Sequence, residues 1–144
     1  MKNLLILLLL VFTVHRATAQ KTTNVTDTIA VSNVEKSCPG GFESFNAFIG
    51  KNVRPPAIAY EDQKVGTTYV SFIIEPDGSI SNACTILAAG SGMDEEVVRV
   101  INSSNNWIPV TIGDKPVRTF CRAGVQFFAD FKKHQMWVAA KRID

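Results

Sequence analysis

The stretch of residues 66–81, GTTYVSFIIEPDGSIS, constrains the fold of this chain more than any other segment. Residues 67–74 are β-branched or aromatic apart from one serine, and a second extended run follows from 79 to about 87. The Glu-Pro-Asp-Gly segment between the two runs indicates a tight turn, because glycine readily adopts the positive φ that such turns need. The sequence therefore predicts a β-hairpin.

Alternation along the first arm of this hairpin indicates where it lies in a sheet. One face is largely apolar and carries Thr68, Val70, Phe72 and Ile74, whereas the other face carries Tyr69, Ser71 and Ile73. A strand with one apolar face and one mixed face is typical of the middle of a sheet that is covered on one side only.

The first 19 residues are expected to be a cleaved secretory signal peptide. A short basic start precedes an apolar run of eleven residues at 4–14, and Ala17-Thr18-Ala19 fits the small-x-small cleavage rule. The alternative, an uncleaved anchor, would need roughly 20 apolar residues to span a membrane. We therefore expect a periplasmic protein with no membrane span after cleavage.

Charge and cysteine content narrow the function classes. Removal of residues 1–19 lowers Lys+Arg from 15 to 13, which equals the 13 Asp+Glu, and no basic stripe for nucleic acid remains. Export implies an oxidising compartment, where Cys38, Cys84 and Cys121 can form at most one internal disulfide. Which two cysteines pair, if any, stays open.

The remaining elements follow from periodicity. Residues 20–37 are interpreted as a linker with a possible short strand at 28–34, and residues 131–144 as a basic tail with a short solvated helix. Apolar spacings of three and four residues predict the main helices, at 42–52 and 93–103, and Pro55-Pro56 ends the first. Pro116 to Asp130 reads as a long strand in which Gly124 suggests a bulge.

The order of these elements predicts an α+β fold with one domain at 38–130. The hairpin strands and the long strand form a three-stranded antiparallel/mixed sheet in the order 2-1-3, and the two main helices pack on one face of it. The long strand should return parallel to the second hairpin strand through a helical crossover. This arrangement leaves the long strand on an open edge.

Residue types for catalysis are sparse, and we expect no enzyme, no cofactor and no metal. His134 is the only histidine beyond the signal peptide, and the acidic residues 94–96 are explained by the first turn of a helix, where carboxylates favour the helix dipole. The alternative is a thiol-based enzyme or redox sensor. No C-x-x-C pair or Cys/His dyad supports it.

From about 39 to 128 the sequence resembles the C-terminal domain of TonB, in the form found in energy-transducer proteins of Bacteroidetes, here without a transmembrane anchor. The matching pieces are PGG at 39–41, VRPPAIA at 53–59, VGTTYVSFIIEPDGSISNA at 65–83, MDEEVVRV at 93–100, Trp107 to Pro109, GDKPVR at 113–118 and VQFF at 125–128.

The resemblance implies an interaction module in which the last strand binds the Ton box segment of outer-membrane receptors by strand addition. The partner would be a TonB-dependent receptor or another envelope protein. The implied binding edge consists of Arg118, Thr119, Phe120, Cys121, Arg122, Ala123, Gly124, Val125 and Gln126. Homodimerisation through the same edge and a purely structural envelope domain are the alternatives.

Overall fold

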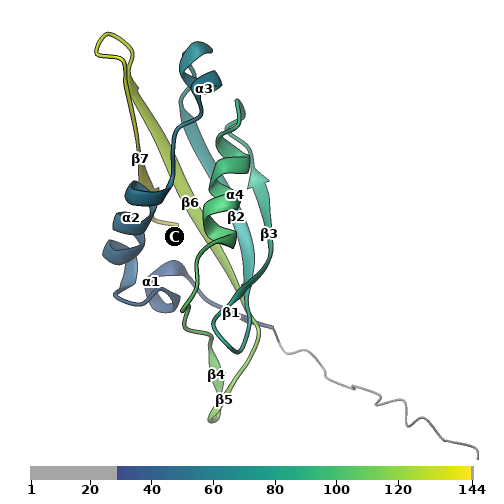
Figure 1. Ribbon diagram of the computed structural model, residues 1–144. Helices are drawn as coiled ribbons and strands as arrows, with labels where there is room; N and C mark the ends of the chain where they lie inside the picture. The colour runs from purple at the N-terminus through teal and green to yellow at the C-terminus, as the bar shows by residue number, and fades with distance from the viewer. Residues whose placement is uncertain (1–28, 144) are drawn as a thin grey trace, which may run out of the picture.

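Helices α2 (Gly41–Asn52) and α4 (Met93–Asn102) cover one face of a twisted sheet in the computed structural model, which describes residues 29–143 (Figure 1). The sheet runs in the order β1-β6-β2-β3, and β7 also pairs with β6. Its strands are β1 (Ala30–Val31), β2 (Gly66–Ile74), β3 (Ile80–Leu87), β6 (Thr119–Asp130) and β7 (Gln135–Lys141). The predicted signal peptide and residues 20–28 lie outside the described residues.

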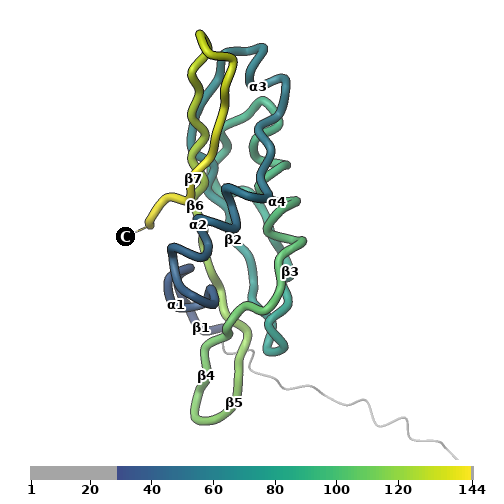
Figure 2. The backbone as a smooth tube through the Cα atoms, turned by 60° about the vertical axis from the view of Figure 1, so that its left-hand side comes forward, coloured from purple at the N-terminus to yellow at the C-terminus, as the bar shows by residue number. Residues whose placement is uncertain are grey.

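Shorter elements connect these layers. They are α1 (Val34–Ser37), α3 (Ala57–Glu61) and a small hairpin of β4 (Thr111–Ile112) and β5 (Lys115–Pro116). Figure 2 shows the small hairpin protruding at one end of the molecule and the β6–β7 turn at the other end.

The predicted hairpin is confirmed as β2 and β3, which pair antiparallel. Its turn closes with hydrogen bonds from the N–H of Glu75 to the carbonyl of Ser79 and from the N–H of Gly78 to the carbonyl of Glu75, both at 2.9 Å. Gly78 has a φ of +81°, and a Cβ there would lie 2.6 Å from the carbonyl oxygen of Trp107. Only glycine fits both conditions.

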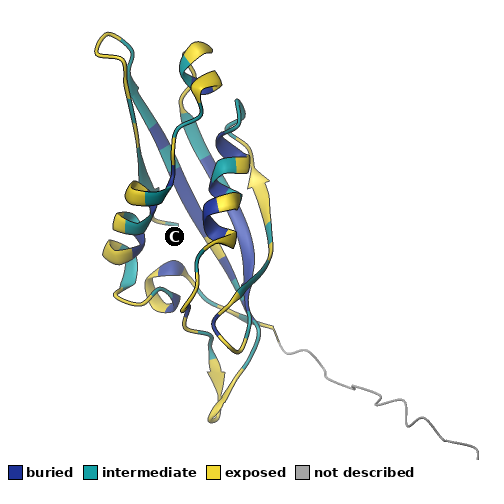
Figure 3. Cartoon of the chain, in the orientation of Figure 1, coloured by how far each residue is buried: buried dark blue, intermediate teal, exposed yellow. Residues whose placement is uncertain are grey.

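The core lies between the sheet and the two main helices. The inner side chains Val70, Phe72 and Ile74 of β2 are buried, as the alternation predicts. Ser71 and Ile73 on the opposite face are buried as well, which the alternation did not predict. Figure 3 shows buried residues along β2 and β6, whereas much of β3 is exposed. The inner side chains of β2 pack in one cluster with Phe45 and Ile49 of α2 and with Val97, Val100 and Ile101 of α4. Each fully buried side chain of this size contributes about 1.5–3 kcal/mol relative to an exposed one, so this cluster fixes the helices on the sheet.

The α+β class is confirmed, and the three expected strands are neighbours in the expected sequence, β3-β2-β6. Both β3 and β6 pair antiparallel with β2, so they run parallel to each other. The prediction of only three strands is wrong, however, because β1 and β7 also pair with β6.

The predicted helix in the tail 131–144 is instead strand β7. Met136, Val138 and Ala140 are half-buried and pack against the core. Their spacing of two residues fits a strand better than a helix. Pairing with β6 also satisfies backbone groups that a short, solvated helix would leave to water.

Two further expectations need correction. Residues 30–37 of the interpreted linker form β1 and α1, and Val34 is buried in the core. Gly124 marks no bulge, since β6 pairs with β2 through nine consecutive residues without a register shift. A Cβ at Gly124 would instead lie 3.1 Å from the ring of Tyr69, its cross-strand neighbour, so the glycine makes room for that ring.

Candidate functional site: the edges of the sheet

The nine residues of the predicted binding edge lie on β6 or, in the case of Arg118, directly before it. Thr119, Cys121, Ala123 and Val125 point into the core and are buried. The side chains of Phe120, Arg122 and Gln126 lie on the opposite face and are exposed or half-buried, as expected from the alternation.

The expectation that this strand lies on an open edge is wrong. β1 pairs parallel with β6, with Ala30 opposite Thr119 and Val31 opposite Phe120. β7 pairs antiparallel with β6 from Gly124 to Asp130. The physical reason is that the segments interpreted as linker and tail both alternate like strands. They fold back onto the free backbone groups of β6.

Between these two strands, residues 121–123 of β6 pair with neither β1 nor β7 in the described part of the chain. The carbonyls of Arg118 and Phe120 accept hydrogen bonds from the β1 side. Successive strand residues direct their backbone groups to opposite edges, so the N–H and C=O of Arg122 point into this gap.

A shallow hollow of about 290 Å³ opens beside the gap, lined by Val31, Ser32, Asn33, Lys36, Arg122 and Ile143. Neither the ammonium of Lys36 nor the guanidinium of Arg122 has an ion-pair partner among residues 29–143. Arg142, near the same place, is already neutralised by Glu35 at 3.2 Å and Glu43 at 3.4 Å. The hollow therefore presents positive charge.

The edge that does remain open is the outer edge of β3, which has no strand partner in the described part of the chain. Ile86 and Leu87 are more than half exposed along it. Two register shifts interrupt the pairing of β3 with β2, and Asn82 has a φ of +52°. Such irregularities are a common device that blunts an exposed strand.

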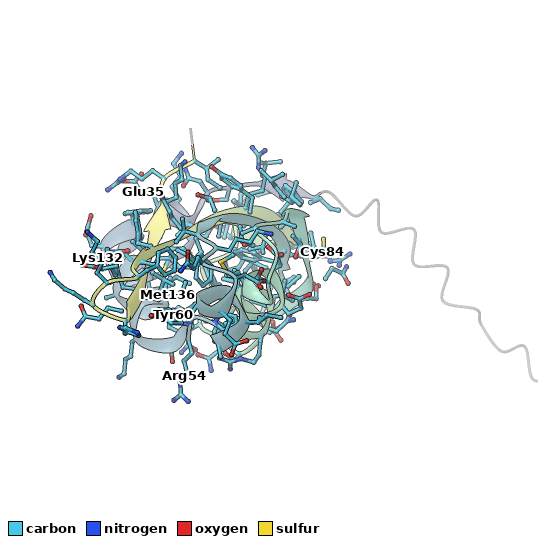
Figure 4. The ribbon with its side chains drawn as sticks, turned by 90° about the horizontal axis from the view of Figure 1, so that it is seen from above. Glu35, Arg54, Tyr60, Cys84, Lys132 and Met136 are labelled. Carbon is cyan, nitrogen blue, oxygen red and sulfur yellow. The ribbon has the colours of Figure 1, made fainter. Side chains whose placement is uncertain are left out.

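The three cysteines are free thiols in different surroundings. Cys84 is exposed on β3, with its Sγ 3.3 Å from the Oγ of Ser71. It lies at the rim of the molecule, on the side opposite Glu35 (Figure 4). Burial raises the pKa of Cys38, and burial raises the pKa of Cys121 to about 12. Burial therefore disfavours the thiolate form of Cys121, which is the form that acts as a nucleophile.

Among residues 29–143, no three His, Cys, Asp or Glu side chains lie close enough together to hold a metal ion. None of the helices in this range is long and apolar enough to cross a membrane. The sequence analysis gave a possible short strand at 28–34, where β1 lies, but it did not predict that this strand pairs with β6, and it missed β7. The alternation of Met136, Val138 and Ala140 was the signal that could have identified β7.

Comparison of the chain with protein-family models, with curated proteins and with solved structures gives no significant match.

Proposed function

We propose that this chain is a periplasmic protein-interaction module, similar to the C-terminal domain of TonB, that binds an extended peptide by strand addition to β6. The Ton box of an outer-membrane receptor is the guest that the resemblance implies. The observation that supports this proposal is that few residues of other strands pair with the outer edge of β6 before Gly124. Only the two-residue β1 pairs there, and the backbone of Arg122 pairs with no strand on that side, among residues 29–143.

β6 is a better template for a guest strand than the open edge of β3. A guest needs several consecutive residues whose N–H and C=O groups alternate regularly. β6 keeps an unbroken register with β2 from Thr119 to Phe127, whereas β3 loses its register twice within eight residues. Once β1 has left, residues 119–123 of β6, which β7 does not pair, offer a guest a regular ladder that the interrupted strand β3 does not provide.

Charge around the hollow specifies the guest further. A guest that runs parallel to β6, as β1 does, would bring its C-terminal end toward Arg122 and Lys36. Both cations lack an ion-pair partner among the described residues. We therefore expect an extended peptide with an acidic residue near its C-terminal end, because a charge-assisted hydrogen bond to arginine is among the stronger polar contacts.

Backbone NMR with a synthetic Ton box peptide from a receptor of the same organism tests this proposal. Chemical-shift changes centred on residues 118–123 are the expected result. Changes confined to 80–87 would move the site to β3, and no change at millimolar peptide would overturn peptide binding altogether.

Two variants of one residue sharpen the test. Arg122→Pro removes a backbone donor that faces the gap and not β2, so binding should be lost while the fold persists. Arg122→Glu keeps that donor but reverses the charge, so binding of an acidic peptide should weaken and lose its salt dependence. Circular dichroism spectra of both variants check that the sheet remains.

Self-association is a second candidate, and the open edge of β3 favours it. Two β3 edges could pair antiparallel and join the sheets of two copies. Ile86 and Leu87 would then be covered. Sedimentation at increasing concentration should show a dimer that Ile86→Lys abolishes. A monomer at all concentrations would exclude this candidate.

A further inference from the structure

β1 occupies the edge of β6 that the proposed function requires. We infer that β1 is an intramolecular competitor, a resident strand that a peptide guest must displace before it can pair with β6. This inference rests on the proposed function and concerns the regulation of the same site.

The hold of β1 on β6 is weak. Its flanking hydrogen bonds run from the N–H of Ala30 to the carbonyl of Arg118 and from the N–H of Ser32 to the carbonyl of Phe120, both at 3.0 Å. The side chain of Val31 is 74% exposed and that of Ile29 is 47% exposed, so little apolar surface is buried with them. Backbone hydrogen bonds in such an exposed segment open at low free-energy cost.

β7 is the contrasting strand on the same edge. It pairs with β6 through seven residues, from Gln135 to Lys141, and half-buried Met136 and Val138 pack against the core. The backbone of Ala140 on its far side is also satisfied, because its N–H donates to the Oδ1 of Asn46 in α2 at 2.8 Å. Of the two strands that pair with this edge of β6, β1 is therefore the one that can dissociate.

The segment after β1 would stay in place when β1 leaves. Val34 is buried, and the N–H of Ile108 donates to the carbonyl of Ser37 at 2.8 Å. The side chain of Asn33 caps α1 by accepting from the N–H of Lys36 at 3.1 Å. Ser32 is also held to this segment, because the hydroxyl of Ser37 donates to the hydroxyl of Ser32 at 2.7 Å. Residues 29–31 can therefore swing away about a pivot at Ser32 without loss of the core.

Competition has a measurable consequence. The apparent dissociation constant of a guest is its intrinsic value divided by the fraction of molecules with a free edge. A change that loosens β1 without touching β6 must tighten peptide binding. The apparent dissociation constant of a guest that binds elsewhere, for example on β3, would not change when β1 is loosened.

Two neighbouring proline substitutions separate these cases. Ala30→Pro removes the N–H that donates to Arg118. Val31→Pro removes the N–H of the next residue, which points away from β6 by the alternation of the strand, and serves as the matched control. Loss of one hydrogen bond corresponds to a change of about threefold to tenfold. We expect Ala30→Pro to bind the Ton box peptide more tightly by that factor, and Val31→Pro to stay within about twofold of the unmodified chain.

The outcomes distinguish this inference from the proposed function. Equal binding by the unmodified chain and both variants overturns the inference. If the chemical-shift changes in the same titrations are still centred on residues 118–123, the proposed function stands without it, whereas changes confined to 80–87 move the site to β3. No binding by any of the three overturns the proposed function and the inference with it.

Amide hydrogen exchange of the unmodified chain without peptide provides an independent check. The amides of Ala30 and Ser32 should exchange at least about a hundredfold faster than those of the β6–β2 ladder. Exchange of these two amides as slow as that of the ladder would show that β1 does not open, and would overturn the inference.

Discussion

The carboxylate of Asp94 accepts a hydrogen bond from the hydroxyl of Thr68 at 2.6 Å, and both side chains are buried where α4 meets β2. The same carboxylate accepts from the N–H of Ala89 at 2.7 Å and from the N–H of Gly90 at 2.8 Å. One side chain therefore ties together the central strand, the loop after β3 and the first turn of α4.

Replacement of this carboxylate should be costly. Asp94→Asn keeps the size of the side chain but exchanges one acceptor oxygen for an amide that cannot accept. The N–H of Gly90 loses its acceptor if the amide replaces Oδ2, and the N–H of Ala89 loses its acceptor if the amide replaces Oδ1. We expect the free energy of unfolding to fall by about 1–3 kcal/mol, the cost of a buried polar group left without its partner. Urea unfolding measures it. Glu95→Gln, in the same helical turn but exposed, is the control and should change stability by less than about 0.5 kcal/mol.

The same carboxylate predicts a pH dependence. Burial raises the pKa of Asp94, but the hydrogen bonds from Thr68, Ala89 and Gly90 lower it more, so that its pKa in the fold lies below the ordinary value. A lowered pKa means that the ionised form stabilises the fold above the unfolded pKa of about 3.9, and that this contribution is lost as the pH falls below it.

Unfolding free energies measured from pH 7 to pH 2.5 check this prediction. The difference between the unmodified chain and Asp94→Asn should be constant at neutral pH and should shrink below about pH 4. Glu75 and Glu96 also have lowered pKa values and destabilise both proteins in acid, so only the difference reports on Asp94. A difference that is independent of pH would contradict the prediction.

Two glycines outside the turns should respond oppositely to alanine. A Cβ at Gly124 would lie 3.1 Å from the ring of Tyr69 and 3.3 Å from the carbonyl oxygen of Lys141, so Gly124→Ala should cost about 1–3 kcal/mol of stability through crowding. Gly50 lies in α2 with no atom within 4 Å of an added Cβ, and Gly50→Ala should gain about 0.5–1 kcal/mol. Thermal melts of both variants provide the comparison.

The thiols should differ in reactivity. Cys84 is exposed, whereas Cys121 is fully buried with a pKa raised to about 12. In the reduced native protein at pH 8, Cys84 should therefore react with a thiol reagent within minutes, and Cys121 only after unfolding. Mass spectrometry of the labelled protein identifies the modified residue. Rapid labelling of Cys121 would contradict this burial and revive the thiol-based alternative.

Several features of the fold could be predicted from the sequence because their causes are local. The Glu75–Gly78 turn depends on the conformational freedom of glycine. Which side chains of β2 face the helices depends on the two-residue alternation of a strand. The two main helices were predictable for the same reason, because their apolar residues recur at helical spacing. The order β3-β2-β6 within the sheet could be predicted from the order of these elements along the chain.

The occupancy of the β6 edge could not be predicted in the same way, because it depends on residues far away in the chain. The pairing of Gly124 with Lys141 and of Thr119 with Ala30 joins segments whose own patterns are too short to specify a partner. A short strand is marginal by itself and acquires its structure only from the sheet edge on which it lies.

By itself, then, the sequence determined the hairpin, the helices and the buried face of each long strand, since alternation and turn chemistry act within a few residues. Only the tertiary structure decided which sheet edges are occupied, because unpaired backbone groups on β6 are satisfied by whichever segment the completed fold brings beside them. In this chain β7 pairs with β6 along seven residues and β1 along two, and the outer edge of β3 has no strand partner among the described residues.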